Sequence, residues 1–199
     1  MGTYTVAITG ASGSIYGVRL LEYLLRKGHT VYLVITKEGG FITKDEVGYD
    51  WRGSKEAVQK KIKKDLKIER ARLHYFSEDE LSAPISSGSV MVDAIVVIPC
   101  SMKTLSGIAH GYANNLVERA ADVMIKEARP LILVPRETPL NTIHLRNMLI
   151  LSEMGVKIIP AMPAFYGHPK RIEELADFLV GKVLDSLGIE NNLFRRWKG

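Results

Sequence analysis

The hydrophobic pattern divides the chain into strand-like and helix-like segments that alternate along its length. Short apolar runs rich in β-branched residues predict strands, whereas apolar residues at helical spacing predict amphipathic helices. The predicted strands cover residues 4–9, 30–35, 72–76, 94–98, 131–134 and 156–159. The predicted helices cover residues 15–26, 54–67, 115–128, 140–154 and 169–187, the fourth opened by a cap at Thr138 and Pro139. Turn residues and charges obscure the boundaries between residues 37 and 93.

Two of the strands, residues 94–98 and 131–134, are apolar at nearly every position. Runs without alternation are typical of parallel strands that are covered on both faces. Strands that alternate with helices predict such a sheet, wound right-handedly. We therefore expect a three-layer α/β fold, with residues 1–199 forming one domain.

A ligand site in such a sheet is expected beyond the carboxyl ends of the strands, near the point where the winding reverses. The segments that follow predicted strands are therefore the candidates for function. They are residues 10–16, 36–40, 99–106, 135–141 and 160–168.

Composition excludes several classes of protein. With 46% hydrophobic and 25% charged residues, the chain is neither disordered nor polytopic in a membrane. No apolar run reaches the ~18 residues that span a bilayer, and no export signal is recognised, so a cytoplasmic location is expected. The single cysteine, Cys100, excludes an internal disulfide, and the five histidines lack metal-ligand spacing. No metal is therefore expected.

The net charge of +5 is compatible with phosphate-bearing ligands, nucleic acid or an acidic surface. Nucleic acid is disfavoured because the lysine run at residues 60–64 has no interleaved aromatic residues. The turn after the first strand contains Gly10, Ser12 and Gly13 just before a helix, an arrangement that can receive an anion. This turn lacks the GxGxxG pattern of dinucleotide-binding proteins. Thr36 follows the second strand, at the position where a dinucleotide-binding enzyme would have an aspartate or glutamate.

Basic residues recur in the second half of the chain. Arg119 and Lys126 lie seven apart on one predicted helix face, where ion pairing on a solvated face is the plain alternative. Arg136 and Glu137 directly follow a buried strand, where a solvated pair has no structural purpose. With Tyr166 and Lys182 they could hold a second phosphate. Cys100 could be a nucleophile, but no histidine partner is evident and buried thiols are common.

Residues 8–24 (ITGASGSIYGVRLLEYL), residues 99–166 with the PRETPL and ERAADV strings, and the final FRRW closely resemble the flavin prenyltransferase (UbiX) family. The resemblance covers essentially the whole chain. It implies a flavodoxin-like Rossmann fold, FMN, and a homododecamer with sites at subunit interfaces. The implied metal-free reaction joins the dimethylallyl group of dimethylallyl phosphate to N5 and C6 of reduced FMN. The product, prenylated FMN, serves UbiD-type decarboxylases.

The resemblance also implies roles for individual residues. Flavin-binding positions are Gly10, Ala11, Ser12, Thr36, Ser101, Met102, Lys103, Thr104 and Arg119. Positions that bind the prenyl phosphate are Lys126, Arg136, Tyr166 and Lys182, the last being arginine in some relatives. Ser12 is implied near the reacting N5, Glu137 as the acid/base residue, and Glu46 as a catalytic glutamate donated by a neighbouring subunit. Trp197 resembles a tail tryptophan near the substrate.

Two other functions stay open at this point. A flavin-dependent cysteine decarboxylase of the phosphopantothenoylcysteine type shares the fold and FMN, but has a PASANT-like segment where this chain has PCSMKT. A non-catalytic FMN carrier would bind flavin without prenylating it.

Overall fold

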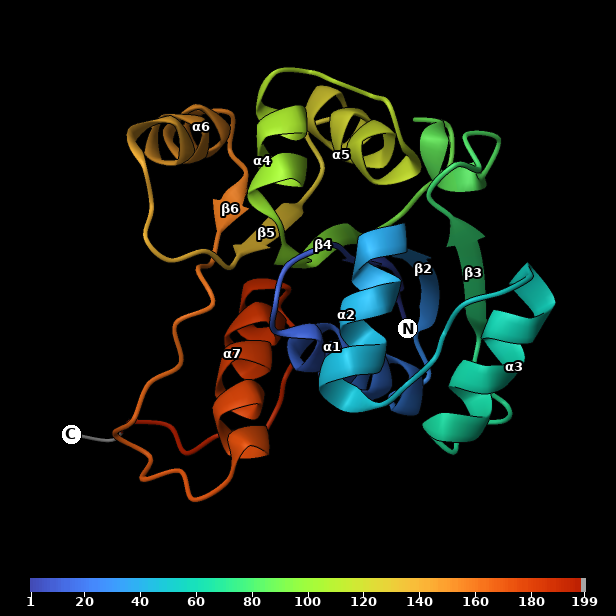
Figure 1. Ribbon diagram of the computed structural model, residues 1–199, viewed down its shortest axis with the longest axis vertical. Helices are drawn as coiled ribbons and strands as arrows, with labels where there is room; N and C mark the ends of the chain where they lie inside the picture. Colours follow the sequence, from blue (N-terminus) through green and yellow to red (C-terminus); the bar gives the residue numbers. More distant parts are fainter. Residues whose placement is uncertain (198–199) are drawn as a thin grey trace.

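The computed structural model describes residues 1–197 and contains a six-stranded sheet in the order β3-β2-β1-β4-β5-β6 (Figure 1). The strands are β1 (Thr3–Ile8), β2 (Thr30–Ile35), β3 (Leu73–Ser77), β4 (Ala94–Cys100), β5 (Leu131–Pro135) and β6 (Lys157–Ile158). The helices are α1 (Ser14–Arg26), α2 (Lys37–Val47), α3 (Lys55–Asp65), α4 (Met102–Ala109), α5 (Leu116–Lys126), α6 (Thr142–Glu153) and α7 (Ile172–Ser186), with a short 3-10 turn at Pro84–Ser86. All strand pairings are parallel, which confirms the predicted fold class.

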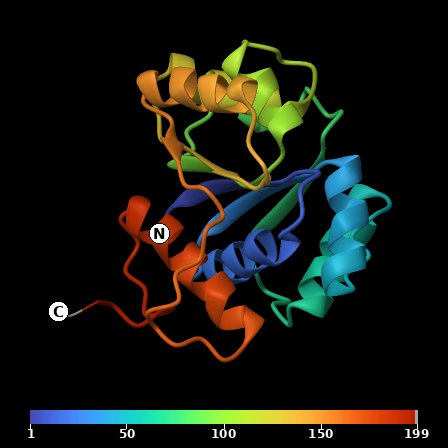
Figure 2. The same cartoon turned by 60° about the vertical axis from the view of Figure 1, so that its left-hand side comes forward.

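Helices cover both faces of the sheet (Figure 2). Alternate residues of β1 face opposite layers: Val6 and Ile8 pack with α1, α3 and α7, whereas Ala7 packs with α4, α5 and α6. Burial on both sides explains why β4 and β5 are apolar at nearly every position. The fully buried chains of Leu20, Leu21 and Leu24 attach α1 to the sheet, which fixes the turn that precedes α1.

The predicted start of the fourth helix at Thr138 and Pro139 is wrong. Helix α6 begins at Thr142, and Asn141 is its N-cap. The Asn141 side chain accepts a hydrogen bond from the His144 backbone N–H at 2.9 Å, and the His144 ring bonds back to the Asn141 N–H. This reciprocal cap satisfies two free donors, which a proline start does not.

The structure also contains a helix, α2, in the stretch where boundaries were obscure. Thr36 caps it by accepting from the Gly39 backbone N–H at 3.1 Å. Adjacent glycines at 39 and 40 disfavour a helix by local propensity. Gly39 is needed because α2 packs tightly on β1: a Cβ on Gly39 would lie 2.5 Å from the Ile8 carbonyl oxygen.

Candidate functional site

The strand order reverses between β1 and β4, so the crevice lies where these two strands end. The loops after them are joined by hydrogen bonds. The Thr9 hydroxyl donates to the Pro99 carbonyl at 2.9 Å and accepts from the Ser101 N–H at 2.8 Å. The glycine turn and the start of α4 therefore form one rigid edge.

A carboxylate of the same chain lies on the glycine turn. One Glu46 oxygen accepts from the backbone N–H of Gly13 at 2.9 Å and of Ser14 at 2.8 Å. Gly13 has φ 100°, a conformation that glycine adopts readily. The anion position predicted from the turn is thus held by Glu46 of the same chain, and its expected role toward a neighbouring subunit stays a prediction.

The hydrogen bonds fix the charge of this carboxyl group. Partial burial alone would raise the pKa of Glu46, but hydrogen bonds from the Ser12 side chain and from the Ser14 and Gly13 backbone outweigh burial. The pKa of Glu46 is therefore lowered, and the group is an anion at neutral pH.

Arg136 comes from the end of β5 and reaches the same turn. Its Nε donates to the Ser12 carbonyl oxygen at 3.2 Å. The half-buried Tyr16 lies nearby: burial raises its pKa, the charge of Arg136 opposes that shift and the charge of Glu46 adds to it. Sequence reasoning missed Tyr16 as a site residue, although it lies in the glycine-turn motif. The ring of Tyr16 fills the space where a Gly13 Cβ would lie.

A cavity of about 300 Å³ adjoins Arg136 at the ends of β5 and β6. Glu137 lines it together with Leu140, Met148 and Met162. A Glu137 oxygen accepts from the Thr138 N–H at 3.0 Å. A carboxylate in a largely apolar cavity suits a small apolar substrate with one proton-transferring group.

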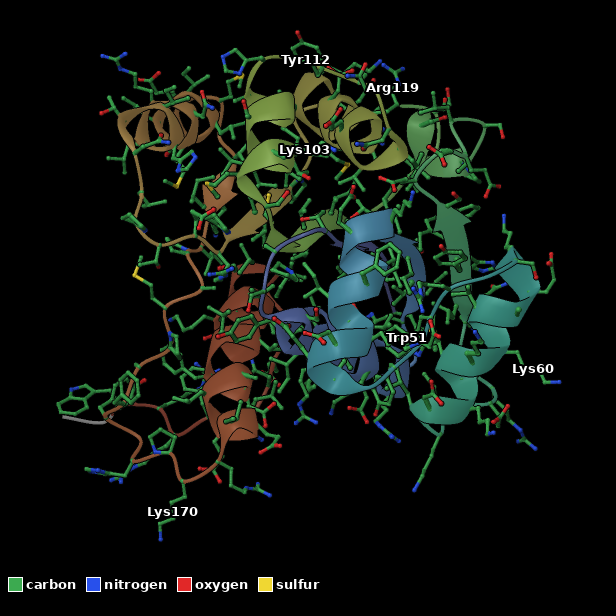
Figure 3. All side chains as sticks on the ribbon, viewed as in Figure 1. Trp51, Lys60, Lys103, Tyr112, Arg119 and Lys170 are labelled. Carbon is green, nitrogen blue, oxygen red and sulfur yellow. The ribbon has the colours of Figure 1, made fainter. Side chains whose placement is uncertain are left out.

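The start of α4 fits a phosphate or the polar tail of a flavin. The Ser101 hydroxyl accepts from the Thr104 N–H at 3.2 Å and lies 3.1 Å from the Thr104 hydroxyl. The N–H groups of the first turn, those of Met102 and Lys103, have no partner within the helix. Figure 3 labels the exposed Lys103 beside this first turn, above α2. Gly10 and Ala11 follow β1 and Thr36 follows β2, at the same edge of the sheet; their binding of flavin stays a prediction.

Two other predicted cations, Arg119 and Lys126, belong to α5. Lys126 ends α5 and pairs with Glu127 at 3.5 Å, close to where β5 begins. Because Arg136 follows the end of β5, these two residues lie at opposite edges of the sheet. Arg119 donates to the Ser86 carbonyl at 3.1 Å and to Asp122 at 3.0 Å, which is the plain ion-pair arrangement.

Tyr166 packs against α7, and Lys182 belongs to that helix. The Tyr166 ring packs edge-on against Phe178 and Trp197, with centroids 5.9 and 5.7 Å away. Lys182 stands 3.9 Å from Asp185. One chain therefore brings Arg136, Glu137, Ser12 and Glu46 together, but leaves Lys126 apart.

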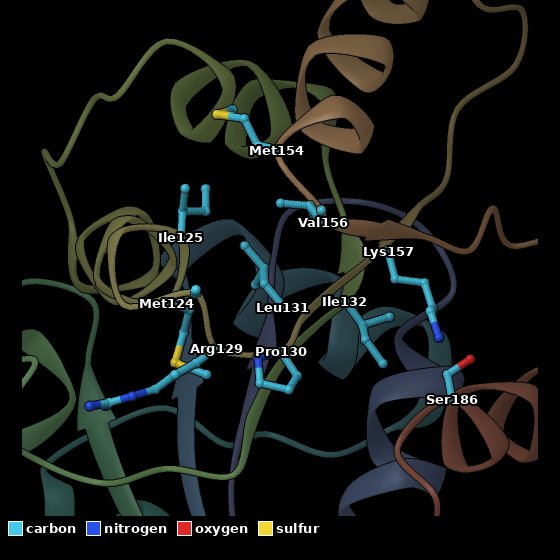
Figure 4. A pocket seen from close by; sticks show the side chains of 12 residues that line it. Met124, Ile125, Arg129, Pro130, Leu131, Ile132, Met154, Val156, Lys157 and Ser186 are labelled. Atoms are coloured by element: carbon cyan, nitrogen blue, oxygen red, sulfur yellow. The ribbon is translucent and has the colours of Figure 1, made fainter.

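A second hollow, of about 420 Å³, lies at the amino ends of β5 and β6 (Figure 4). It is lined by Met124, Ile125, Leu131 and Lys157, among others. None of its lining residues is a predicted site residue, and it lies at the edge of the sheet opposite the crevice. It is not the candidate site.

Among residues 1–197, no group of three or more histidine, cysteine or acidic side chains could hold a metal ion. No helix in the described part of the chain is long and apolar enough to cross a bilayer.

Cys100 is fully buried in β4, and burial raises the pKa of its thiol. A buried neutral thiol is a poor nucleophile. We expect native protein to resist alkylation by iodoacetamide and Cys100→Ala to keep its activity. Mass spectrometry of the treated native and urea-unfolded protein checks this, and rapid labelling of the folded form would contradict it.

Comparison with known proteins shows the family to which the chain belongs. The family model described as Flavoprotein matches residues 3–184. The flavin prenyltransferase UbiX of Halalkalibacterium halodurans is 50% identical over 98% of this chain and 93% of its own length. A solved structure of AnUbiX in complex with FMN and dimethylallyl pyrophosphate has a TM-score of 0.89 at 39% identity, covering 100% of this chain and 98% of that one. A dodecameric FMN-dependent UbiX-like decarboxylase from Escherichia coli has a TM-score of 0.87 at 44% identity, covering 99% and 100%.

The fold, the glycine turn and the family match define the chain as a flavoprotein. Within that class it belongs to the UbiX family of flavin prenyltransferases, as the resemblance indicated.

Proposed function

We propose that this chain transfers the dimethylallyl group of dimethylallyl phosphate to N5 and C6 of reduced FMN, at the crevice between β1 and β4. Prenylated FMN would then serve a UbiD-type decarboxylase. The proposal rests on one observation: two functional groups lie next to each other. Arg136 donates to the Ser12 carbonyl oxygen at the glycine turn, and Glu137 lines the adjoining cavity. The cytoplasmic location remains a prediction from sequence.

The residues at this edge have separate tasks. Ser101, Thr104 and Lys103 bind the phosphate end of the flavin, and the glycine turn supports its ring. Reduced FMN, when bound, supplies the nucleophilic N5 and C6 atoms. Arg136 holds the phosphate of the prenyl donor through its guanidinium fork.

Ionisation of an allylic phosphate places negative charge on the leaving oxygens. Fixed cations aimed at those oxygens stabilise this charge, an effect that can reach several kcal/mol in a site without bulk water. The apolar wall of the cavity, with Leu140 and Met148, excludes water from the allylic group. Glu137 takes or returns a proton at its carboxylate during ring closure.

The reaction is tested by anaerobic incubation of the protein with reduced FMN and dimethylallyl phosphate. The released flavin should gain the mass of one five-carbon unit. An unchanged flavin mass would contradict the proposal and favour an FMN carrier. Conversion of a cysteinyl substrate instead would favour the decarboxylase alternative.

The site is expected to be shared between copies of the chain, because Lys126 lies at the opposite edge from Arg136. Helix α6 offers a surface for assembly: Leu145 and Leu149, four residues apart and therefore on one helix face, are 53% and 58% exposed. Exposed apolar side chains that lie together are typical of an interaction site. A homododecamer, as named for the Escherichia coli relative, is the proposed assembly.

We expect Leu149→Glu to reduce the assembly to smaller species, because it places a charge in the contact. Size-exclusion chromatography with light scattering measures the mass, and circular dichroism checks the fold. Ala57→Glu, at an exposed position of α3, is the control for added charge. An unchanged mass for Leu149→Glu would exclude this helix face as the contact.

A further inference from the structure

The excess positive charge of the chain is concentrated in residues 55–72. This segment contains eight lysine and arginine residues and three acidic residues, a net charge of +5. The whole chain has the same net charge of +5, so the residues outside the segment are neutral in sum. The segment comprises α3 and the turn that leads into β3. We define the basic patch as Lys60, Lys63, Lys64, Lys67, Arg70 and Arg72.

The cations of the basic patch lack carboxylate partners. Among residues 1–197, none of them belongs to an ion pair, whereas Arg19, for example, pairs with Asp177 at 2.7 Å. Lys60 and Lys64 lie four residues apart, a spacing at which like charges destabilise a helix. Lysines near a helix C-terminus interact favourably with its partial negative charge, which offsets part of this repulsion. The charge of the patch itself stays uncompensated.

The basic patch faces away from the core. Val58 and Ile62 are fully buried and attach α3 to the sheet. By the 3.6-residue repeat of a helix, Lys60 and Lys64 lie on the opposite side of α3, and both are exposed. Figure 3 shows Lys60 extending outward from the fold. A buried apolar stripe therefore holds these cations on an anchored surface that faces solvent.

The patch is remote from the crevice and from α6. Helix α3 packs on β3, the edge strand at the opposite side of the sheet from β6 and α6 (Figure 1). An assembly contact on α6 therefore leaves the patch uncovered. The patch precedes the start of β3, whereas the crevice lies where β1 and β4 end. Because parallel strands start at the same edge of a sheet, the patch does not serve the phosphates of the flavin or of the prenyl donor.

The chemistry of the patch favours a layer of lipid phosphates as its partner. Four of the six cations are lysines, which are hydrated point charges without the bidentate fork of arginine. Lysine is depleted from protein–protein interfaces, whose centres are apolar and aromatic. Residues 55–72 contain no aromatic residue and no exposed large apolar one, which also disfavours stacking on single-stranded nucleic acid. Clusters of about four to eight cations on a helix are typical of attraction to anionic lipids.

We propose that the basic patch binds an anionic membrane surface through the phosphates of the lipid headgroups. The apolar side of α3 is buried against the sheet, so the helix stays in the headgroup layer and does not insert. An assembly of several copies presents several patches, which raises the avidity for a surface. The inference does not depend on the prenylation reaction.

Co-sedimentation of the assembled full-length protein with vesicles tests the inference. The vesicles contain phosphatidylglycerol and phosphatidylcholine in equal parts, and vesicles of phosphatidylcholine alone are the reference. We expect binding only to the anionic vesicles, and weaker binding as salt rises, because salt screens exposed charges. Lys60→Gln, Lys63→Gln and Lys64→Gln together should lower the partition coefficient about 100-fold, since each lysine near an anionic surface contributes about fivefold.

The matched control combines Lys27→Gln, Lys157→Gln and Lys170→Gln, which remove the same charge at exposed positions outside the patch. This control should bind the anionic vesicles as the unaltered protein does. Circular dichroism and light scattering check the fold and the assembly of each variant. If the triple patch variant fails to fold, Lys60→Glu alone carries the test, because Lys60 lies at an exposed position.

Equal binding to both kinds of vesicle, unchanged binding by the patch variants, or an equal loss in the control would overturn the inference. Binding to a DNA duplex or to polyglutamate in place of the vesicles would also overturn it, and would assign the patch to nucleic acid or to an acidic protein. Failure of the prenylation assay would leave the vesicle results unaffected, so the two proposals fail separately.

Discussion

Glu137→Gln is expected to bind FMN as tightly as the unaltered protein and to prenylate it about 100-fold more slowly or worse, the range that general acid/base catalysis contributes. Glutamine has the same shape and can still accept from the Thr138 N–H, so the loop and the cavity persist. It cannot take up or release the proton. Flavin titration and single-turnover mass spectrometry measure binding and chemistry separately.

Glu153→Gln, at an exposed position ending α6, is the matched control and should leave both quantities unchanged. Normal turnover by Glu137→Gln would remove this residue from the mechanism. Loss of FMN binding by Glu137→Gln would instead show that the glutamate supports the flavin site rather than the proton transfer.

A mixed assembly of two inactive variants is expected to recover activity. If Lys126 of one copy serves the Glu137 of another, Lys126→Ala chains and Glu137→Gln chains complement each other. Random mixing of equal amounts at symmetric interfaces should restore about a quarter of the sites. The physical reason is the placement of Lys126 and Arg136 at opposite edges of one sheet. Co-expression followed by the prenylation assay measures the recovery.

Arg136→Ala mixed with Glu137→Gln is the control, because these neighbours belong to the same chain's cavity. Every site in that mixture lacks one of the two groups, so it should stay inactive. Recovery in the control, or none in the Lys126 mixture, would show that the phosphate site is not shared in this way.

Much of the fold is predictable from local patterns. The six strands fall within a few residues of their predicted positions because their apolar runs are long enough to mark burial. Helix α2 was missed because Gly39 and Gly40 argue against a helix, and only the tertiary contact of Gly39 with β1 explains why a glycine stands at that position. The start of α6 was misplaced because Thr138 and Pro139 imitate a cap, whereas Asn141 provides the real one.

The candidate site could be predicted only in part from the sequence. The glycine turn and the Arg136–Glu137 pair stand out because each follows a strand. Tyr16 does not, because its proximity to Arg136 and Glu46 depends on residues that are distant along the chain.

The sequence by itself determined the parallel α/β architecture, the edge of the sheet where a ligand is proposed to bind, and membership of the flavin prenyltransferases. These follow from periodicity and from motifs, which are local. Only the tertiary structure decided that Glu46 and Glu78 lie on the starts of α1 and α2, and that Lys126 is separated from Arg136. The position of a charge relative to a helix terminus depends on how the elements pack, and no residue spacing along the chain encodes that distance.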